Sequence, residues 1–166
     1  QGRDVELSLD HIIGGAEQAG NGWGMLMEAL AAGRGIFLPA LNTGGCHYVT
    51  RVAGAYAAVR RQFGHPIGDF EGVQELLAPL GGLSYTMSAA ARFTCAAVDA
   101  GAKPAVVSAV LKYNTSEFNR TVIDGGMDLL GGAGIVLGPR NLLAYGYFSA
   151  PIAITVEGSN PITRSL

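Results

Sequence analysis

A single carboxylate near the C-terminus is the first candidate for chemistry. Glu157 lies in "ITVEGSN", between aliphatic residues and a glycine, in a chain of which only 14% is charged. Apolar surroundings disfavour the ionised form of a carboxyl group and make its carboxylate a stronger base. A general base that removes a weakly acidic proton benefits from such surroundings. We expect Glu157 at the mouth of an apolar cavity; the alternative is an ordinary solvated turn.

Two other stretches have residue types that could contact a ligand. The arginines of "RRQFG" (60–64) could form a planar fork for two phosphate oxygens. Arginines close to a helix C-terminus are equally explained by the helix dipole. "GGAGIVLG", from Gly131, lacks the GKS or GKT ending of a phosphate loop. By itself it is explained by a helix C-terminus with left-handed glycines. For both stretches the ligand role remains an open alternative.

The histidines and cysteines indicate no metal site. His11, His47 and His65 are far apart, and none has a partner at zinc-ligand spacing. Cys46 and Cys95 lie in stretches with a helical pattern and lack the framework of a disulfide-rich secreted domain. We expect both to be buried free thiols.

The hydrophobic pattern predicts three long helices that would position these residues. Apolar residues recur at helical spacing from about residue 21 to Phe63, and again over 70–99. A third helix, with Pro104 in its first turn, is predicted to end near Gly125 and Gly126. The apolar stripe predicted on this helix comprises Val107, Val110, Leu111, Phe118 and Val122, with the polar Asn114 at the same spacing. Short elements are expected over 127–134 and 141–148. The fold predicted is an all-α antiparallel bundle over 21–166, with an extended lead-in over 1–20.

Composition narrows the classes of function. The net charge of −2 shows no basic excess, so we expect no nucleic-acid partner. Hydrophobic residues make up 49% of the chain, and we expect part of this apolar surface to meet a partner. The N-terminal stretch has no apolar signal-peptide core, and the expected location is cytoplasmic. Because the chain begins with Gln, we expect a fragment or a processed product.

Three stretches, taken in order, resemble the C-terminal part of the flavin-dependent acyl-CoA dehydrogenases. They are "RRQFGHPIGDFEGVQELLA", "LLGGAGI" and "ITVEGSNPITR", and the resemblance spans Gly22 to Arg164. "LDHIIGG" and "GWGMLMEALAAGRGI" are similar to the long bacterial fatty-acid β-oxidation members of that family. Each motif is weak alone, whereas the ordered set is specific.

This resemblance implies an oxidoreductase of fatty-acid β-oxidation, which converts an acyl-CoA to the trans-2-enoyl-CoA with FAD as acceptor. Glu157 matches the family's catalytic base, and its backbone N–H is expected to hold the thioester carbonyl. The resemblance also implies ligand contacts for other positions. Arg60 and Phe63 match residues that contact the FAD of a neighbouring subunit, and Gly131, Gly132 and Gly134 match the glycine turn at the FAD pyrophosphate or adenosine. Ser159 and Asn160 match positions near the flavin, and Arg34 and Gly158 match positions that bind the substrate.

The resemblance also implies partners and missing parts. Family members form dimers or dimers of dimers and pass electrons to a partner, so a homo-oligomer and an electron-transfer partner are expected. Their N-terminal helical and middle domains have no counterpart here, apart from residues 1–20, which we interpret as a remnant of the middle domain. We therefore expect the isolated chain to be inactive. The alternatives are a stand-alone helical oligomerisation or interaction module derived from such an enzyme, and an oxidase that passes electrons to O₂.

Overall fold

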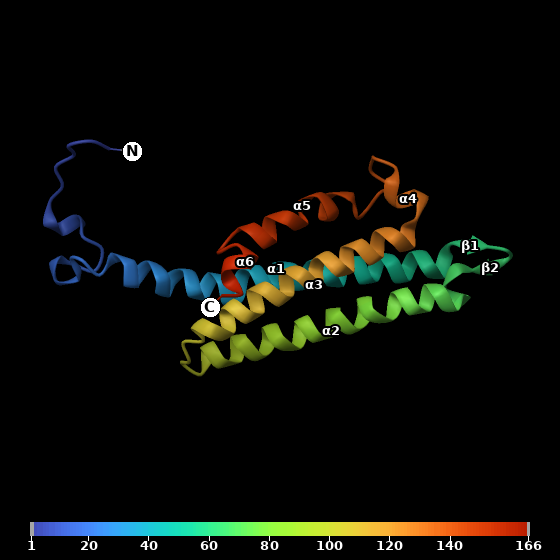
Figure 1. Ribbon diagram of the computed structural model, residues 1–166, viewed down its shortest axis with the longest axis horizontal. Helices are drawn as coiled ribbons and strands as arrows, with labels where there is room; N and C mark the ends of the chain where they lie inside the picture. Colours follow the sequence, from blue (N-terminus) through green and yellow to red (C-terminus); the bar gives the residue numbers. More distant parts are fainter. Residues whose placement is uncertain (1, 166) are drawn as a thin grey trace.

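Three long helices, α1 (Gly22–Val59), α2 (Glu71–Asp99) and α3 (Ala105–Leu130), lie side by side in the computed structural model (Figure 1). The structure describes residues 2–165, apart from the side chain of Ala32. Each long helix packs against the other two, and α2 runs antiparallel to α1 and α3. The predicted all-α antiparallel bundle is confirmed.

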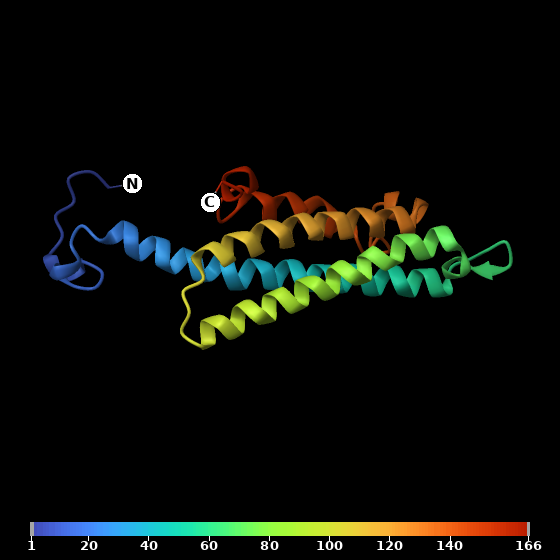
Figure 2. The ribbon, with the colours of Figure 1, turned by 60° about the horizontal axis from the view of Figure 1, so that its bottom comes forward.

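Short elements connect and cover the bundle. A hairpin of β1 (Arg61–Gln62) and β2 (His65–Pro66) follows α1, and the 3-10 helix η3 (Ile67–Asp69) leads into α2. After α3 come α4 (Gly132–Ile135), α5 (Ala144–Thr155) and α6 (Asn160–Thr163). Figures 1 and 2 show that α5 runs back along α3, so that α6 lies near the start of that helix. This return brings residue 157 close to the first turns of α3.

The apolar core lies between α1, α2, α3 and α5. Its buried members are Cys46, Val49, Ala53, Ala57, Leu80, Met87, Val122, Ile123, Leu129, Leu130, Leu143 and Ala150. A Cβ placed on Gly126 would lie 2.5 Å from Cγ1 of Val49, closer than carbon atoms approach. A glycine is therefore needed where α3 packs against α1. Both cysteines are free, as predicted, but Cys95 is only half-buried.

Two predicted helix ends were wrong. The first helix ends at Val59, not near Phe63, because Phe63 and Gly64 take φ values of 50° and 84° and form the turn of the hairpin. The third helix continues through Gly125 and Gly126 to Leu130. These glycines permit close packing against α2 and α1, and packing outweighs the low intrinsic helix propensity of glycine.

The lead-in, predicted to be extended, contains two short 3-10 helices, η1 (Leu9–His11) and η2 (Ala16–Gln18). The Ser8 side chain accepts a hydrogen bond from the Asp10 N–H and favours the first of these turns. The outer limits of the predicted domains, Gln1 and Leu166, lie outside the described residues. That residues 1–20 derive from a middle domain stays a prediction.

The N-terminal part of α1 extends beyond the bundle (Figure 1). Four of its large apolar side chains are exposed: Trp23, Leu26, Met27 and Leu30. By length and composition α1 could cross a membrane, although the core helix of a soluble protein meets the same criterion. Its C-terminal half supplies Val49, Ala53 and Ala57 to the core. The exposed stripe is thus apolar surface that α2 and α3 leave uncovered.

Candidate active site

Glu157 lies in the turn between α5 and α6. Its backbone has a φ of 55°, and Gly158 follows with a φ of 92°, so two consecutive residues take left-handed conformations. Oε1 of Glu157 lies 3.6 Å from the position that a Cβ on Gly33 of α1 would occupy. The missing side chain of Gly33 leaves room for the carboxylate against the α1 backbone. The turn therefore directs Glu157 toward the N-terminal third of α1.

Lys112, near the start of α3, forms hydrogen bonds to the segment that follows Glu157. Its Nζ donates to the carbonyl oxygen of Gly158 at 2.6 Å and to Oδ1 of Asn160 at 2.7 Å. The side chain is 0% exposed to solvent. The hydroxyl of Thr163 donates to the same Gly158 carbonyl at 3.1 Å. A buried ammonium group and a hydroxyl thus converge on one backbone oxygen next to Glu157.

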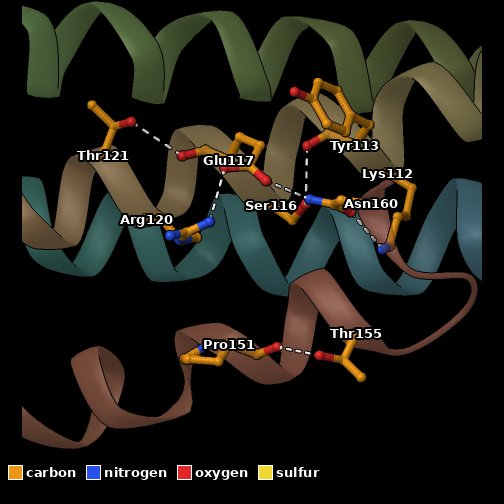
Figure 3. Close-up of polar contacts among 9 residues, drawn as sticks. All are labelled: Lys112, Tyr113, Ser116, Glu117, Arg120, Thr121, Pro151, Thr155 and Asn160. Carbon is orange, nitrogen blue, oxygen red and sulfur yellow. Dashed lines mark hydrogen bonds and ion pairs between the residues drawn. The ribbon is translucent and has the colours of Figure 1, made fainter. Parts of the chain in front are cut away.

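Asn160 extends this contact into a polar network (Figure 3). Its Nδ2 donates to Oγ of Ser116 at 2.9 Å and to Oε1 of Glu117 at 2.7 Å. Arg120 in turn donates to Oε2 of Glu117 at 3.1 Å. Buried polar groups are tolerated when their hydrogen bonds are satisfied. The network joins α6 to α3 and thereby fixes the C-terminal end of the Glu157 turn.

Opposing charges meet around Lys112. Burial lowers the pKa of its ammonium group, and the neighbouring Arg34 lowers that pKa further. The carboxylates of Glu157 and Glu117 act in the opposite direction and favour the charged form. Arg34 also reaches toward the turn, since its Nη1 lies 4.0 Å from the position of a Cβ on Gly158. Its Nε is buried and has no hydrogen-bond partner among residues 2–165.

An apolar cavity of about 280 Å³ lies between α1, α3 and α5, next to this turn. Ile152, Ala153 and Val156 line it from the turn side. Glu157 itself does not line the cavity, and its side chain is exposed. The expectation of an acid at the mouth of an apolar cavity was therefore only partly right: Val156 lines the cavity, whereas the exposed carboxylate of Glu157 lies against Gly33 of α1.

The remaining predicted FAD contacts lie at the opposite end of the bundle. Arg60 is the exposed C-terminal cap of α1. Phe63 at the hairpin tip is 90% exposed, and its ring makes an edge contact with Phe70. Gly131 links α3 to α4 with a φ of 52°. Gly131 and Gly132 have open space where a side chain would be, whereas Gly134 is buried against the carbonyl oxygen of Met127.

The predicted site residues thus form two groups. Arg34, Glu157, Gly158 and Asn160 meet around Lys112, with Ser159 at the N-cap of α6. Arg60 and Phe63 belong to the hairpin end, and Figure 1 shows the turn between α3 and α4, which contains Gly131, at the same end of the bundle. Lys112 and Gly131 are separated along α3 by about 28 Å at 1.5 Å per residue. A single small group cannot touch both ends.

Sequence reasoning missed the buried polar face of α3. It comprises Ser108, Lys112, Thr115, Ser116 and Asn119. These residues recur at helical spacing, and that pattern in "SAVLKYNTSEFN" is the signal that could have revealed them. The predicted apolar stripe was wrong at Val107 and Val110, which are exposed. Polar side chains lie on the inner face because partners on α1 and α6 satisfy several of their hydrogen bonds. Asn42 of α1 donates to Thr115, and Asn160 of α6 accepts from Lys112 and donates to Ser116.

A family comparison assigns the chain. Residues 20–166 match the family model described as "Acyl-CoA dehydrogenase, C-terminal domain". The chain belongs to this family. The acyl-CoA dehydrogenase C-terminal domain is all-α, in agreement with the helical bundle described above.

Two relatives agree with the assignment by name, and a third carries a different name. The chain is 28% identical over 172 residues to the probable acyl-CoA dehydrogenase FadE10 of Mycobacterium tuberculosis, covering 98% of this chain and 26% of the relative. The solved structure of a glutaryl-coenzyme A dehydrogenase with glutaryl-CoA matches at a TM-score of 0.81 and 28% identity, covering 88% of this chain and 36% of the other. Protein HemX of Proteus mirabilis is 49% identical over 55 residues, 33% of this chain and 32% of HemX. The chain spans about a third or less of the length of these curated relatives.

Proposed function

We propose that the chain is the catalytic-base-bearing domain of an FAD-dependent acyl-CoA dehydrogenase, which oxidises a fatty acyl-CoA to the trans-2-enoyl-CoA. The observation that carries the proposal is the left-handed Glu157–Gly158 turn, anchored by Lys112 within a chain of this family. The glutaryl-CoA complex of the solved relative supports a CoA thioester as substrate. An oxidase of the same superfamily remains the alternative for the electron acceptor.

The residues at the hairpin end fit an FAD contact. Arg60 supplies an exposed cation for pyrophosphate, Phe63 an exposed aromatic ring, and Gly131 and Gly132 a backbone that a ligand can approach closely. When bound, FAD supplies the acceptor for the two electrons and the β-hydrogen. Because this end is far from Glu157, we assign its contacts to the FAD of a neighbouring subunit. A homo-oligomer follows from that assignment.

Glu157 performs the acid–base step. Its carboxylate takes the proton from the acyl-CoA carbon next to the thioester carbonyl. The β-hydrogen of the same acyl chain leaves as hydride. No acceptor for the backbone N–H of Glu157 occurs among residues 2–165, so this donor is free to bind the thioester oxygen as negative charge develops there. Arg34, with its Nε unpaired, lies where it can bind the polar part of the substrate.

The carboxylate is exposed in this chain, whereas a strong base needs a dry environment. We therefore assign the exclusion of water from Glu157 to the bound substrate and to domains outside this chain. Accordingly, purified 166-residue chain should retain no stoichiometric flavin and no dehydrogenase activity. Flavin absorbance at near-equimolar level in the purified chain would contradict this expectation.

The test of the proposed base is Glu157→Gln in the flavin-loaded enzyme that carries this chain. We expect the bleaching of flavin absorbance on adding acyl-CoA to slow by roughly 100- to 10,000-fold, the range for loss of a general base. The matched control is Glu75→Gln, the same change at an exposed residue of α2, which should bleach at the wild-type rate. Equal rates for wild type and Glu157→Gln would remove Glu157 as the base.

The exposed apolar stripe of α1 favours the second candidate, an interaction module without activity. The two candidates differ in what covers Trp23 and Leu26: other domains of an enzyme, or a second copy of the chain. An in-frame upstream coding region of several hundred codons would favour the enzyme. A start codon directly before residue 1 would favour the module.

A further inference from the structure

We propose that Lys112 is a positioning residue for Glu157: its buried ammonium group fixes the Glu157–Gly158 turn through the Gly158 carbonyl and the Asn160 side chain. The inference rests on the proposed function, because positioning matters only if Glu157 is the base. No substrate or cofactor contact is assigned to Lys112.

The burial of Lys112 indicates that its ammonium group makes specific hydrogen bonds inside the protein. Taking an ammonium group out of water is unfavourable unless hydrogen bonds replace its hydration. Two of its three protons are accounted for by Gly158 O at 2.6 Å and Asn160 Oδ1 at 2.7 Å. Both acceptors belong to the segment that directly follows Glu157. The ammonium group of Lys112 therefore binds this segment and not the carboxylates of its own helix.

The turn needs an external anchor. A left-handed φ at a non-glycine residue is intrinsically unfavourable and persists only where surrounding contacts impose it. Glu157 has a φ of 55°, and its own side chain makes no hydrogen bond to another residue in the 2–165 region. The Gly158 carbonyl, one residue on, receives both Lys112 and Thr163. Fixing that carbonyl fixes the Gly158–Ser159 peptide plane, one peptide beyond the one that joins Glu157 to Gly158.

Charges from each neighbouring element face the ammonium group. Glu157 approaches from the turn, Glu117 from α3 itself and Arg34 from α1. Neither carboxylate forms an ion pair with Lys112 within 4.0 Å in the described part of the chain, and Arg34 is itself a cation. The direct contacts of Lys112 are thus the neutral oxygens of Gly158 and Asn160, which is the arrangement expected of an anchor rather than of a counter-ion.

The chain offers a matched pair of variants, because it has only two lysines, Lys103 and Lys112. Lys112→Met removes the buried ammonium group and keeps the length of the side chain. Lys103→Met makes the same change in the exposed ion pair with Glu28. Both are to be measured in the flavin-loaded enzyme that carries this chain, by the rate of flavin reduction, by acyl-CoA binding and by hydrogen exchange of residues 156–160.

For Lys112→Met we expect flavin reduction to slow roughly 100-fold, because a displacement of about 1 Å at a reacting group has an effect of that size. The dissociation constant for acyl-CoA should stay close to wild type, and amide exchange over 156–160 should accelerate. Lys103→Met should leave all three unchanged. A Lys112→Met enzyme that loses thermal stability but reduces flavin at the wild-type rate would overturn the proposal.

Thr163→Val provides a second variant if Lys112→Met does not fold. It removes the other donor to the Gly158 carbonyl and keeps the shape of the side chain. Slower flavin reduction with faster exchange over 156–160 supports the anchor, whereas wild-type values for both overturn it. If the wild-type enzyme does not oxidise acyl-CoA, the proposed function fails, and the exchange of residues 156–160 alone decides whether Lys112 holds the turn.

Discussion

The two ends of the bundle carry predicted site residues in opposite ways. Around Glu157, groups from α3 and α6 converge through buried hydrogen bonds of 2.6 to 3.1 Å. At the hairpin end, Phe63 is 90% exposed and Gly131 faces open space. The first end is organised by the chain itself. The second has the character of a surface that is completed by something outside this chain.

This difference predicts opposite responses to substitution. Changes at the Lys112 end should lower the free energy of unfolding of the chain, because they break buried polar contacts. Changes to exposed side chains at the hairpin end should leave stability almost unchanged and affect only what binds there, and a loss of stability is expected only where the backbone itself requires glycine, as at Gly131. Four experiments, in decreasing order of the expected effect, test this contrast.

Asn160→Ala should have the largest effect. The change removes an acceptor from the buried Lys112 ammonium group and a partner from Ser116 and Glu117. We expect the free energy of unfolding to fall by about 3 kcal/mol, the scale for breaking a buried contact to a charged group. Urea unfolding of the chain, with Asn114→Ala as control, measures it. A loss equal to that of the control would show that the network is not stabilising.

Gly131→Ala and Gly132→Ala form a matched pair at the other end. Gly131 has a φ of 52° that side chains rarely adopt, whereas Gly132 is in α4; neither would collide with another group. We expect Gly131→Ala to lower stability by about 1 to 2 kcal/mol through backbone strain alone. Gly132→Ala should be neutral or slightly stabilising. Equal effects in thermal unfolding would mean that strain is not what requires the first glycine.

Arg60→Ala should separate binding from stability. In the free chain it should change the unfolding free energy by less than about 0.5 kcal/mol, as for other exposed residues. In the assembled enzyme it should weaken FAD affinity roughly tenfold, the loss expected for one charge-assisted hydrogen bond. A fluorescence titration with FAD measures this, and Arg92→Ala on α2 is the control. Unchanged affinity would remove Arg60 from the FAD contacts.

The smallest effect concerns pH. Burial lowers the pKa of Lys112 below its ordinary value of 10.5, so between the two values the unfolded chain binds a proton that the folded chain does not. The free energy of unfolding of wild type, relative to that of Lys112→Met, should therefore rise as the pH increases from the lowered pKa to 10.5. Burial raises the pKa of Cys46 to about 12, but this thiol titrates in both proteins and cancels. A flat difference would argue against a buried charge.

Much of the fold was predictable because helical spacing is a local signal. The second helix was predicted over 70–99 and extends from Glu71 to Asp99. The end of the third helix was not predictable, since Gly125 and Gly126 normally indicate a helix terminus. Here they lie against Leu80 and Val49 of neighbouring helices, and no local pattern reports what a residue will face after folding.

The candidate site divides in the same way. The motif around Glu157 and its family could be found from residue types and order, and the family match over 20–166 agrees. The roles of the individual site residues stay predictions. Lys112 was missed because it lies 46 residues from Gly158 along the chain, and the local sequence "VLKYN" does not indicate which acceptor the lysine will bind.

The amino-acid sequence alone specifies three long helices in a bundle, because apolar residues recur at helical spacing, and it shows the order of the motifs directly. Which side chains meet became known only from the folded arrangement. The return of α5 along α3 brings the Glu157 turn onto Lys112 and separates both from the hairpin end. The physical reason is that the pairing of buried donors and acceptors depends on distances through space, which chain position does not specify.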